Sequence, residues 1–435
     1  MRKANRASGE GRKGGSLSAR KSASKRHAAR AAARARGPVP GSVKASRGSA
    51  TAPAAVLPVE SDLAPFAMHA HQTRGRRYKE PEHPFRSPFQ RDRDRIIHSR
   101  AFRRLEYKTQ VFLNHEGDHF RTRLTHSIEV SQVGRTVARA LGLNRDLVEA
   151  LSLSHDLGHT PFGHLGEEVL DEMMKGRGGY NHNRQSLRIV EWLEDRYPGW
   201  PGLNLTYELR EGIAKHSGPV PLKSAPEFAE YEPKVAPPLE AQMIDIVDEI
   251  GYNHHDVDDG VRAGLLPPER LARDIPIFGE PWREAGRQYP RASVRQLVAV
   301  ALTAMIDALV TDLVETSRKR IRDSGVESVD DVRSMDRWLI GLSPRMAARN
   351  ARLKRYLKEE LYTHQRIERV KDKSRRILRS LFERYLDNPL LLESHVQAKF
   401  RKEGRERVIC DYIAGMTDRF AIDEYRRLFS PEVLP

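Results

Sequence analysis

Two adjacent residues, His155 and Asp156, have the types and the position of a metal-binding pair. Leu147 and Leu151 lie eight and four residues before His155, so the imidazole continues the apolar face of a helix. A histidine and an acid on a buried face need a partner, because burying an uncompensated charge is costly. A metal ion is one such partner. The alternative is a core histidine bonded to a backbone carbonyl, with Asp156 capping the next turn.

Two further residues, His126 and Asp248, are also potential metal ligands that should face a core. His126 begins a stripe that Val130 continues at helical spacing, so its side chain should face a core. Asp248 lies one turn beyond Ile244 and can face inward as well. Two imidazoles and two carboxylates suit Mn, Fe, Co, Mg or Zn, and they leave positions for water and phosphate oxygens. We therefore predict a divalent metal site, with the ion left open, formed by His126, His155, Asp156 and Asp248.

The segment 155–167 adds candidates for acid–base chemistry, with three histidines within thirteen residues. His164 and Glu167 are three residues apart and share a face if a helix starts there. A glutamate bonded to an imidazole fixes its tautomer and raises its basicity, as in acid–base pairs. His182 opens a further helix and is a second candidate, while capping by Asn181 is an alternative use of that segment.

Histidine is concentrated in this part of the chain, since eleven of the seventeen histidines fall between His98 and His255. The adjacent pair His254 and His255 also has residue types suited to metal chemistry. Neither residue completes the four-ligand set, so we interpret both as polar neighbours of the site.

The elements that must position these residues are helices. Apolar residues recur at intervals of three and four from about residue 90 to residue 264, and strand-like alternation of any length is missing. Gly and Pro residues punctuate these stretches. Beyond a Pro- and Gly-rich connector, residues 294–319, 345–386 and 408–429 again have helical spacing. The pattern predicts an all-α architecture in two helical blocks.

The net charge of +16 belongs to the N-terminal tail. The first fifty residues contain fourteen Lys or Arg and one acidic residue, so the rest of the chain carries only +3. Residues 1–62 have too few large apolar side chains to offset the entropy of ordering, and we expect a disordered basic tail. Such a tail could contact nucleic acid weakly through phosphate charge, or it could be a solvated extension or the product of a mis-set start codon.

Other features of the composition favour a cytoplasmic protein. The single cysteine, Cys410, excludes an intramolecular disulfide and is expected to be a small core residue. No apolar run approaches the roughly 18 residues that a membrane span requires, so we expect no transmembrane segment, and the first residues lack the apolar core of a signal peptide.

The candidate metal ligands occur in the same order as in the sequence signature of a known superfamily. His126, then His155-Asp156, then Asp248 resembles the H…HD…D signature of the HD phosphohydrolases. The sequence around these residues is similar to that of the deoxyguanosinetriphosphate triphosphohydrolase-like proteins. The similarity is close over residues 71–265 and looser to about residue 430. The segments that carry this likeness are 103–112, 123–127, 155–167, 181–183, 207–218 and 248–252, followed by Asp256. We accordingly divide the chain into the tail (1–62), an HD core (63–265) and a C-terminal helical region (266–435).

The resemblance implies a reaction in which water attacks the α-phosphorus of a deoxynucleoside triphosphate, giving a deoxynucleoside and triphosphate. The four-residue metal site would polarise the phosphate and position the water. His164, oriented by Glu167, would be the acid–base group, with His182 as the second candidate for protonating the leaving 5′-oxygen. Arg123 would clamp phosphate. Gln110, Tyr252 and Asp256 would line the sugar pocket, where a close contact to the 3′-hydroxyl would exclude a 2′-oxygen.

Two other functions remain open at this point. An HD hydrolase acting on another nucleotide phosphate ester would use the same metal site. A nucleic-acid-binding protein with a regulatory HD site is suggested by the basic tail. The resemblance also implies self-association, of an order that the sequence does not determine.

Overall fold

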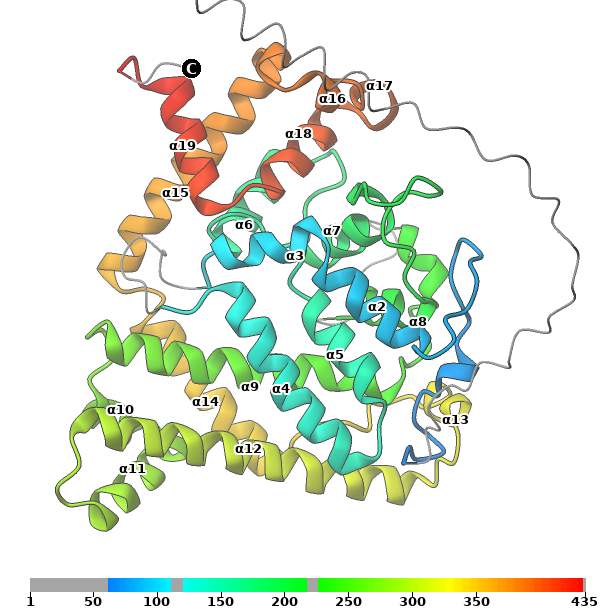
Figure 1. Ribbon diagram of the computed structural model, residues 1–435. Coiled ribbons are helices and arrows are strands. Elements are labelled where there is room, and N and C mark those ends of the chain that lie inside the picture. Colours follow the sequence, from blue (N-terminus) through cyan, green and yellow to red (C-terminus); the bar gives the residue numbers. More distant parts are fainter. Residues whose placement is uncertain (1–61, 111–119, 217–225, 433–435) are drawn as a thin grey trace, which may run out of the picture. The chain divides into compact units, whose positions relative to one another are not determined.

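Three helices bring the predicted metal-site residues to one region: α4 (Arg123–Leu141), α5 (Arg145–Ser154) and α9 (Leu239–Arg262). The structure is a computed structural model that describes residues 62–110, 120–216 and 226–432. α4 packs against both α5 and α9, and α5 also contacts α9 (Figure 1). His126 lies on α4, His155 at the end of α5 and Asp248 on α9.

Local signals define the ends of these helices. The Thr122 side chain accepts the N–H of Thr125 to start α4, and Gly142 ends that helix with a φ of 71°. The Asn144 side chain accepts the N–H groups of Asp146 and Leu147 to start α5. Because these caps are encoded within a few residues, the sequence alone locates the helices well.

The remaining helices complete an all-α fold. The part of the chain that precedes α9 also contains α2 (Pro88–Ile97), α3 (Arg100–Arg104), α6 (His164–Met173), α7 (His182–Arg188) and α8 (Tyr207–Ala214). After α9 come α10 (Pro268–Asp274), α11 (Pro276–Gln288), α12 (Val294–Ser324), α13 (Val329–Arg333), α14 (Pro344–Glu360), α15 (Gln365–Asp387), α16 (Ser394–Gln397), α17 (Phe400–Glu403), α18 (Arg405–Ala414) and α19 (Asp418–Phe429). The described residues form no strand, only two isolated bridges. The all-α prediction is confirmed.

The helices surround two hydrophobic cores. The main core is formed by α4, α5 and α9 together with residues of α10 to α14, so helices from both sides of the predicted boundary at residues 265 and 266 share it. A second core joins Val169 and Leu170 of α6 to Leu378 of α15, Ile409 of α18 and Ala421 of α19. Figure 1 shows α15, α18 and α19 gathered around α6. The C-terminal helices are therefore packed directly against the segment that carries His164 and Glu167.

Helix α12 is longer and more apolar than we expected from the sequence. Among the described residues it is the one helix long and apolar enough to cross a membrane when judged by length and composition. Its buried side chains, which include Leu302, Met305 and Leu309, pack into the main core, and α12 contacts α4, α9 and α11. Core helices pass the same test of length and composition, so this property does not itself indicate a membrane span.

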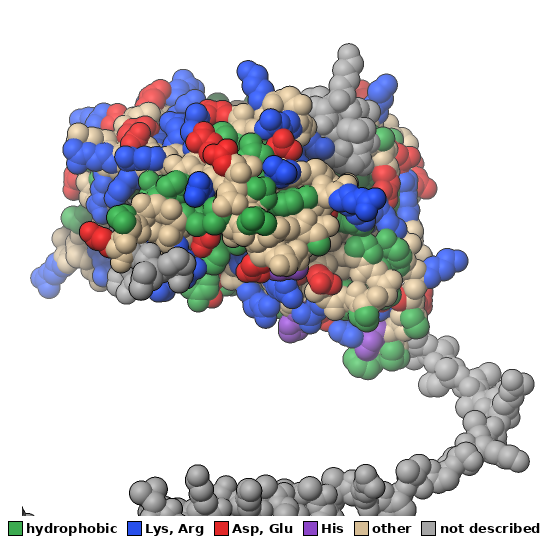
Figure 2. Space-filling model, turned by 90° about the horizontal axis from the view of Figure 1, so that it is seen from above, with side chains coloured by type: hydrophobic (Ala, Val, Ile, Leu, Met, Phe, Trp, Pro, Cys, Tyr) green, Lys and Arg blue, Asp and Glu red, His purple; other side chains and the backbone are tan. Residues whose placement is uncertain are grey.

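Composition also led to predictions about Cys410, the N-terminal tail and the surface charge. Cys410 is fully buried in the second core, as expected. Apart from Asp62, the tail predicted to be disordered lies outside the described residues. On the face shown in Figure 2, basic and acidic side chains are interspersed, in keeping with the small net charge of the chain beyond residue 50.

Candidate active site

A cavity of about 1350 Å³ lies where α4, α6, α9, α14 and α15 meet. Its wall contains residues from all of the predicted groups: His126 and Asp156 of the metal site, His164 and His182 of the acid–base group, and Arg123. A cavity of this size accommodates a nucleotide.

The four predicted metal-site residues lie together, and three of them, His126, Asp156 and Asp248, line this cavity. His126 Nε2 is 2.9 Å from Asp248 Oδ1 and 3.8 Å from Asp156 Oδ2. His155 Nε2 is 3.3 Å from Asp156 Oδ1 and 3.5 Å from Asp248 Oδ1. Both histidines are almost fully buried. Nitrogen and oxygen atoms of His126, His155 and Asp248 all lie within 4.8 Å of one another, close enough to hold one metal ion.

His155 provides a test of whether a metal fits. Its Nδ1 lies 2.6 Å from the carbonyl oxygen of Ser152, which can only accept a hydrogen bond, so the proton of a neutral imidazole is on Nδ1. Its Nε2 is buried and has no hydrogen-bond partner. A buried ring nitrogen with a free lone pair, facing two carboxylates, is the arrangement expected of a metal ligand.

The carboxylates are held in their ionised form. Burial alone would raise the pKa of Asp156, but the adjacent His155 ring and the Arg123 guanidinium hold that pKa well below its usual range. Burial is likewise outweighed at Asp248, where the close approach of the His126 and His155 rings keeps the pKa well below its usual range. Two ionised carboxylates and two imidazoles form a site suited to a divalent cation.

Arg123 contacts the metal-site group directly. Its Nη1 donates to Asp156 Oδ2 at 2.9 Å, and the guanidinium is 2% exposed. The Nε–H of Arg123 is buried without a hydrogen-bond partner, although the residue lines the cavity. The side chain thus retains an unused donor, as the predicted phosphate clamp requires.

The predicted acid–base group has a different pairing from the one expected from spacing. Glu167 Oε2 lies 2.8 Å from His182 Nδ1, whereas its distance to His164 Nδ1 is 3.9 Å. His164 is 78% exposed in its side chain, and His182 is half-buried. Glu167 also accepts the backbone N–H of His182 at 3.0 Å. The expected orientation of His164 by Glu167 is therefore weak, and Glu167 orients His182.

Close packing explains how His182 reaches this place. A Cβ at Gly158 would collide with the carbonyl oxygen of His182, so only glycine allows the start of α7 to approach the end of α5. The Ser186 hydroxyl accepts the N–H of Gly158 at 2.8 Å and donates to the carbonyl oxygen of His155 at 3.0 Å. This contact joins the end of α5 to the start of α7, so the spacing of residues along a single helix could not predict it.

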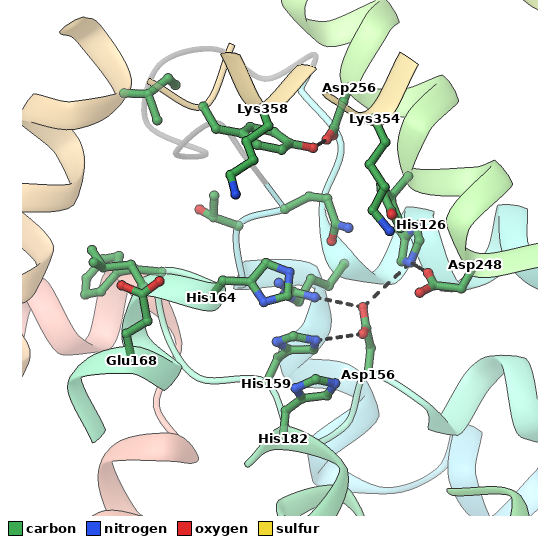
Figure 3. Close-up of a pocket in the computed structure, with 18 of the residues that line it drawn as sticks. His126, Asp156, His159, His164, Glu168, His182, Asp248, Asp256, Lys354 and Lys358 are labelled. Atoms are coloured by element: carbon green, nitrogen blue, oxygen red, sulfur yellow. Dashed lines mark hydrogen bonds and ion pairs between the residues drawn. The ribbon is translucent and has the colours of Figure 1, made fainter. Parts of the chain in front are cut away.

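His159 is a site residue to which the sequence analysis assigned no role. Its Nε2 lies 3.1 Å from Asp156 Oδ1, and its ring stacks on that of His182 with centroids 4.3 Å apart. Figure 3 shows His159, His164 and His182 on one side of Asp156, and His126 with Asp248 on the other. Burial and the charge of Arg123 hold the pKa of His159 well below its usual range, so its imidazole is neutral. The cluster of histidines in residues 155–167 was the available signal.

The residues predicted to line a sugar pocket also border the cavity. Gln110, Tyr252 and Asp256 are all in its wall. Asp256 is buried and accepts a hydrogen bond from the Tyr362 hydroxyl, and burial raises the pKa of its carboxyl to about 7. Gln110 Oε1 is buried without a hydrogen-bond partner. Their roles in binding stay predictions.

The C-terminal helices contribute a wall of the cavity that the sequence analysis missed. Basic side chains of α14 and α15 line it: Lys354, Arg355, Lys358, Lys371 and Arg375. The Nζ of Lys354 lies over the ring of Tyr252, 5.5 Å from its centroid. The interval of four residues between Lys354 and Lys358 was visible in the sequence, but nothing in the sequence located the helix face that carries them.

Comparisons with known proteins agree with this arrangement. A family model described as the HD domain matches residues 123–252, and one described as the phosphohydrolase-associated domain matches residues 340–427. The fold is thus that of an HD-domain protein.

Relatives of similar length specify the family. A deoxyguanosinetriphosphate triphosphohydrolase-like protein of Geobacter metallireducens is 50% identical over 85% of this chain and 96% of its own length. Another from Thiobacillus denitrificans is 50% identical over 86% of this chain and 99% of its own length. The chain belongs to the family of deoxyguanosinetriphosphate triphosphohydrolase-like proteins, which confirms the resemblance seen in its motifs.

Proposed function

We propose that this protein is a metal-dependent hydrolase that converts a deoxynucleoside triphosphate, such as dGTP, into the deoxynucleoside and triphosphate. The family name supports the substrate class. The observation that carries the proposal is the position of Asp156. Its carboxylate contacts the metal-site histidines on one side and Arg123 and His159 on the other, so one residue joins the metal site to the groups that face the cavity.

The proposed metal ligands are His126, His155, Asp156 and Asp248. When bound there, a divalent metal supplies Lewis-acid polarisation of phosphoryl oxygens and lowers the pKa of a coordinated water. The protein side chains provide binding and proton transfer. The unused Nε–H of Arg123 would donate to phosphate, and Arg355 and Lys358 of α14 would balance part of the remaining charge of the triphosphate.

The acid–base group lies beside this position. Glu167 holds the Nδ1 proton of His182, which leaves Nε2 of His182 to exchange a proton. The exposed His164 is the other candidate for protonating the leaving 5′-oxygen. Asp256, with Gln110 and Tyr252, would bind the sugar, and a close contact at the 3′-hydroxyl would select deoxyribose. Equal rates with ribonucleoside triphosphates would contradict this selectivity.

The experiment is a product analysis of the purified full chain. Each of the four deoxynucleoside triphosphates and GTP would be incubated with Mn²⁺ or Mg²⁺, singly and as a mixture, and the products separated by ion exchange. We expect a deoxynucleoside and intact triphosphate. His126→Ala and Asp248→Ala should abolish turnover, while His98→Ala, a change at an exposed histidine outside the cavity, should not.

Other outcomes select other functions. Release of pyrophosphate or single phosphate would keep an HD metal site but contradict attack at the α-phosphorus. No turnover with any metal or mixture would favour another phosphate ester as substrate. Loss of DNA binding on deletion of residues 1–62, without any hydrolysis, would favour a nucleic-acid-binding protein.

The proposal extends to the location of the enzyme, its self-association and the role of its tail. We infer a cytoplasmic protein that self-associates, with a tail that contacts nucleic acid only weakly. We also retain the division into tail, HD core and C-terminal region. Sedimentation of the full chain with and without nucleotide would test the self-association.

A further inference from the structure

His126 and His155 differ in what holds their second ring nitrogen. The Nδ1 of His155 faces the Ser152 carbonyl, which fixes the proton there. The Nδ1 of His126 instead lies 3.3 Å from the Nδ1 of His255. An imidazole nitrogen can donate or accept, so this contact alone leaves the tautomer of His126 undetermined.

The far side of His255 removes the ambiguity. Its Nε2 contacts the Glu129 carboxylate, which can only accept a hydrogen bond when ionised. A neutral His255 therefore carries its proton on Nε2 and presents a lone pair at Nδ1. His126 must then donate from Nδ1, which leaves the lone pair of its Nε2 directed at Asp248 and the metal site.

Burial shields this chain of contacts from solvent. His126 and His255 are each 1% exposed, so water cannot replace either partner. Glu129 is itself held by the guanidinium of Arg121, whose Nε lies 3.3 Å from Oε1. Arg121 is anchored in turn by Asp258 at 2.7 Å. The acceptor at the outer end of the chain is thus fixed in place.

We propose that Glu129 and His255 are positioning residues that fix the tautomer of His126 and so prepare its Nε2 to bind a divalent metal. The inference rests on the proposed function, because it takes His126 as a metal ligand. Outer partners of this kind commonly change metal affinity by about 10- to 100-fold when removed.

A second metal ion is the competing occupant of this cluster. Atoms of Glu129, His254 and His255 lie within 4.8 Å of one another. An ion on Nε2 of His255 would require a lone pair there and a proton on Nδ1. That proton would point at Nδ1 of His126 and place the His126 proton on Nε2, against the catalytic ion. While the Nδ1 to Nδ1 contact persists, an ion at one site excludes an ion at the other.

Two matched pairs of variants test the proton chain. In His255→Asn the amide oxygen can take the place of Nδ1 as acceptor, while His255→Leu has similar size and no acceptor. Glu129→Gln keeps an acceptor for His255, and Glu129→Met lacks one at the same charge. The readout is Mn²⁺ affinity of the full chain without substrate, from the electron paramagnetic resonance of free Mn²⁺.

We expect His255→Leu to weaken Mn²⁺ binding by about 10- to 100-fold, with His255→Asn much closer to the unaltered protein. Glu129→Met should bind more weakly than Glu129→Gln, and this pair carries the test if His255→Leu fails to fold. His254→Ala should bind Mn²⁺ with unchanged affinity and stoichiometry.

Two results would overturn the inference. The first is equal Mn²⁺ affinity of the two variants within each matched pair. The second is loss of a second Mn²⁺ equivalent in His254→Ala, which would make the cluster a metal site. If His126→Ala lowers Mn²⁺ affinity while the outer variants do not, only this inference fails. If His126→Ala binds Mn²⁺ normally, the proposed metal site fails as well.

Discussion

Asp418 accepts the backbone N–H of Phe162 at 2.9 Å, although the two residues lie 256 positions apart. The other carboxylate oxygen of Asp418 accepts the N–H of Thr109, also at 2.9 Å. Phe162 has a φ of 63°, an unusual conformation for a residue with a side chain. One buried carboxylate at the start of α19 therefore holds the two segments that carry His164 and Gln110 at the cavity.

Removing this carboxylate should impair both stability and catalysis. In Asp418→Ala, two buried N–H groups lose their acceptor, and each such loss costs about 1–3 kcal/mol. We expect a lower free energy of unfolding in urea and a lower kcat/KM, since both segments lose their anchor. The control is Asp423→Ala, because Asp423 lies on the same helix and is 40% exposed. Unchanged kinetics in Asp418→Ala would show that the anchor does not position the site.

The guanidinium of Arg123 is expected to matter through its geometry as well as its charge. Arg123→Lys keeps a positive charge but loses the planar set of donors that reaches Asp156 and the cavity. Loss of a donor to the reacting group typically lowers kcat by about 100-fold or more. Arg322→Lys, at a residue 73% exposed, serves as the control for steady-state kinetics. Equal activity of Arg123→Lys and the unaltered enzyme would exclude a role for the forked donors.

The carboxyl of Asp256 should give the activity a dependence on pH. Burial raises its pKa from 3.8 to about 7, and the hydrogen bond from Tyr362 acts in the opposite direction. The ionised form, which accepts a hydrogen bond from a 3′-hydroxyl, is then the major form only above about pH 7. We expect kcat/KM to rise with pH through that value.

Two variants identify the group responsible. Tyr362→Phe removes a hydrogen bond that favours the ionised form, so the rise should move to higher pH. Asp256→Asn has no carboxyl to ionise, so its kcat/KM should be low and should lack this rise. An unchanged midpoint in both variants would assign the rise to another group.

Metal removal should lower the stability of the protein as well as its activity. A ligand that binds only the folded state stabilises it by about 2.7 kcal/mol when present at 100 times its Kd. Chelation should therefore lower Tm, and Mn²⁺ should restore it. In Asp248→Asn, which lacks one of the carboxylates beside His126 and His155, Mn²⁺ should leave Tm unchanged. A normal response of Tm in that variant would place the ion elsewhere.

Cys410 should be inert in the folded protein. It is fully buried, and burial raises the pKa of its thiol to about 12, so the reactive thiolate is scarce at neutral pH. A thiol reagent should modify Cys410 only after unfolding, and the rate should follow global unfolding in urea. Fast modification of the native protein would indicate local opening of the core formed by α15, α18 and α19.

Much of the fold could be predicted because its signals are local. The Thr122 and Asn144 caps and the intervals of three and four apolar residues locate α4 and α5. The same intervals turn His126 inward, and the order of His126, His155-Asp156 and Asp248 indicates the family. The helix at residues 294–319 was expected, but its length and apolar composition, sufficient by themselves for a membrane span, were not.

The sequence by itself determined the all-α class, the four residues of the candidate metal site and the family. Only the tertiary structure decided that Glu167 pairs with His182, that His159 joins Asp156, and that α14 and α15 supply a basic wall. It also decided that His255 and Glu129 lie behind His126. The physical reason is that spacing along a chain fixes neighbours on one helix, whereas contacts between helices depend on how their side chains pack.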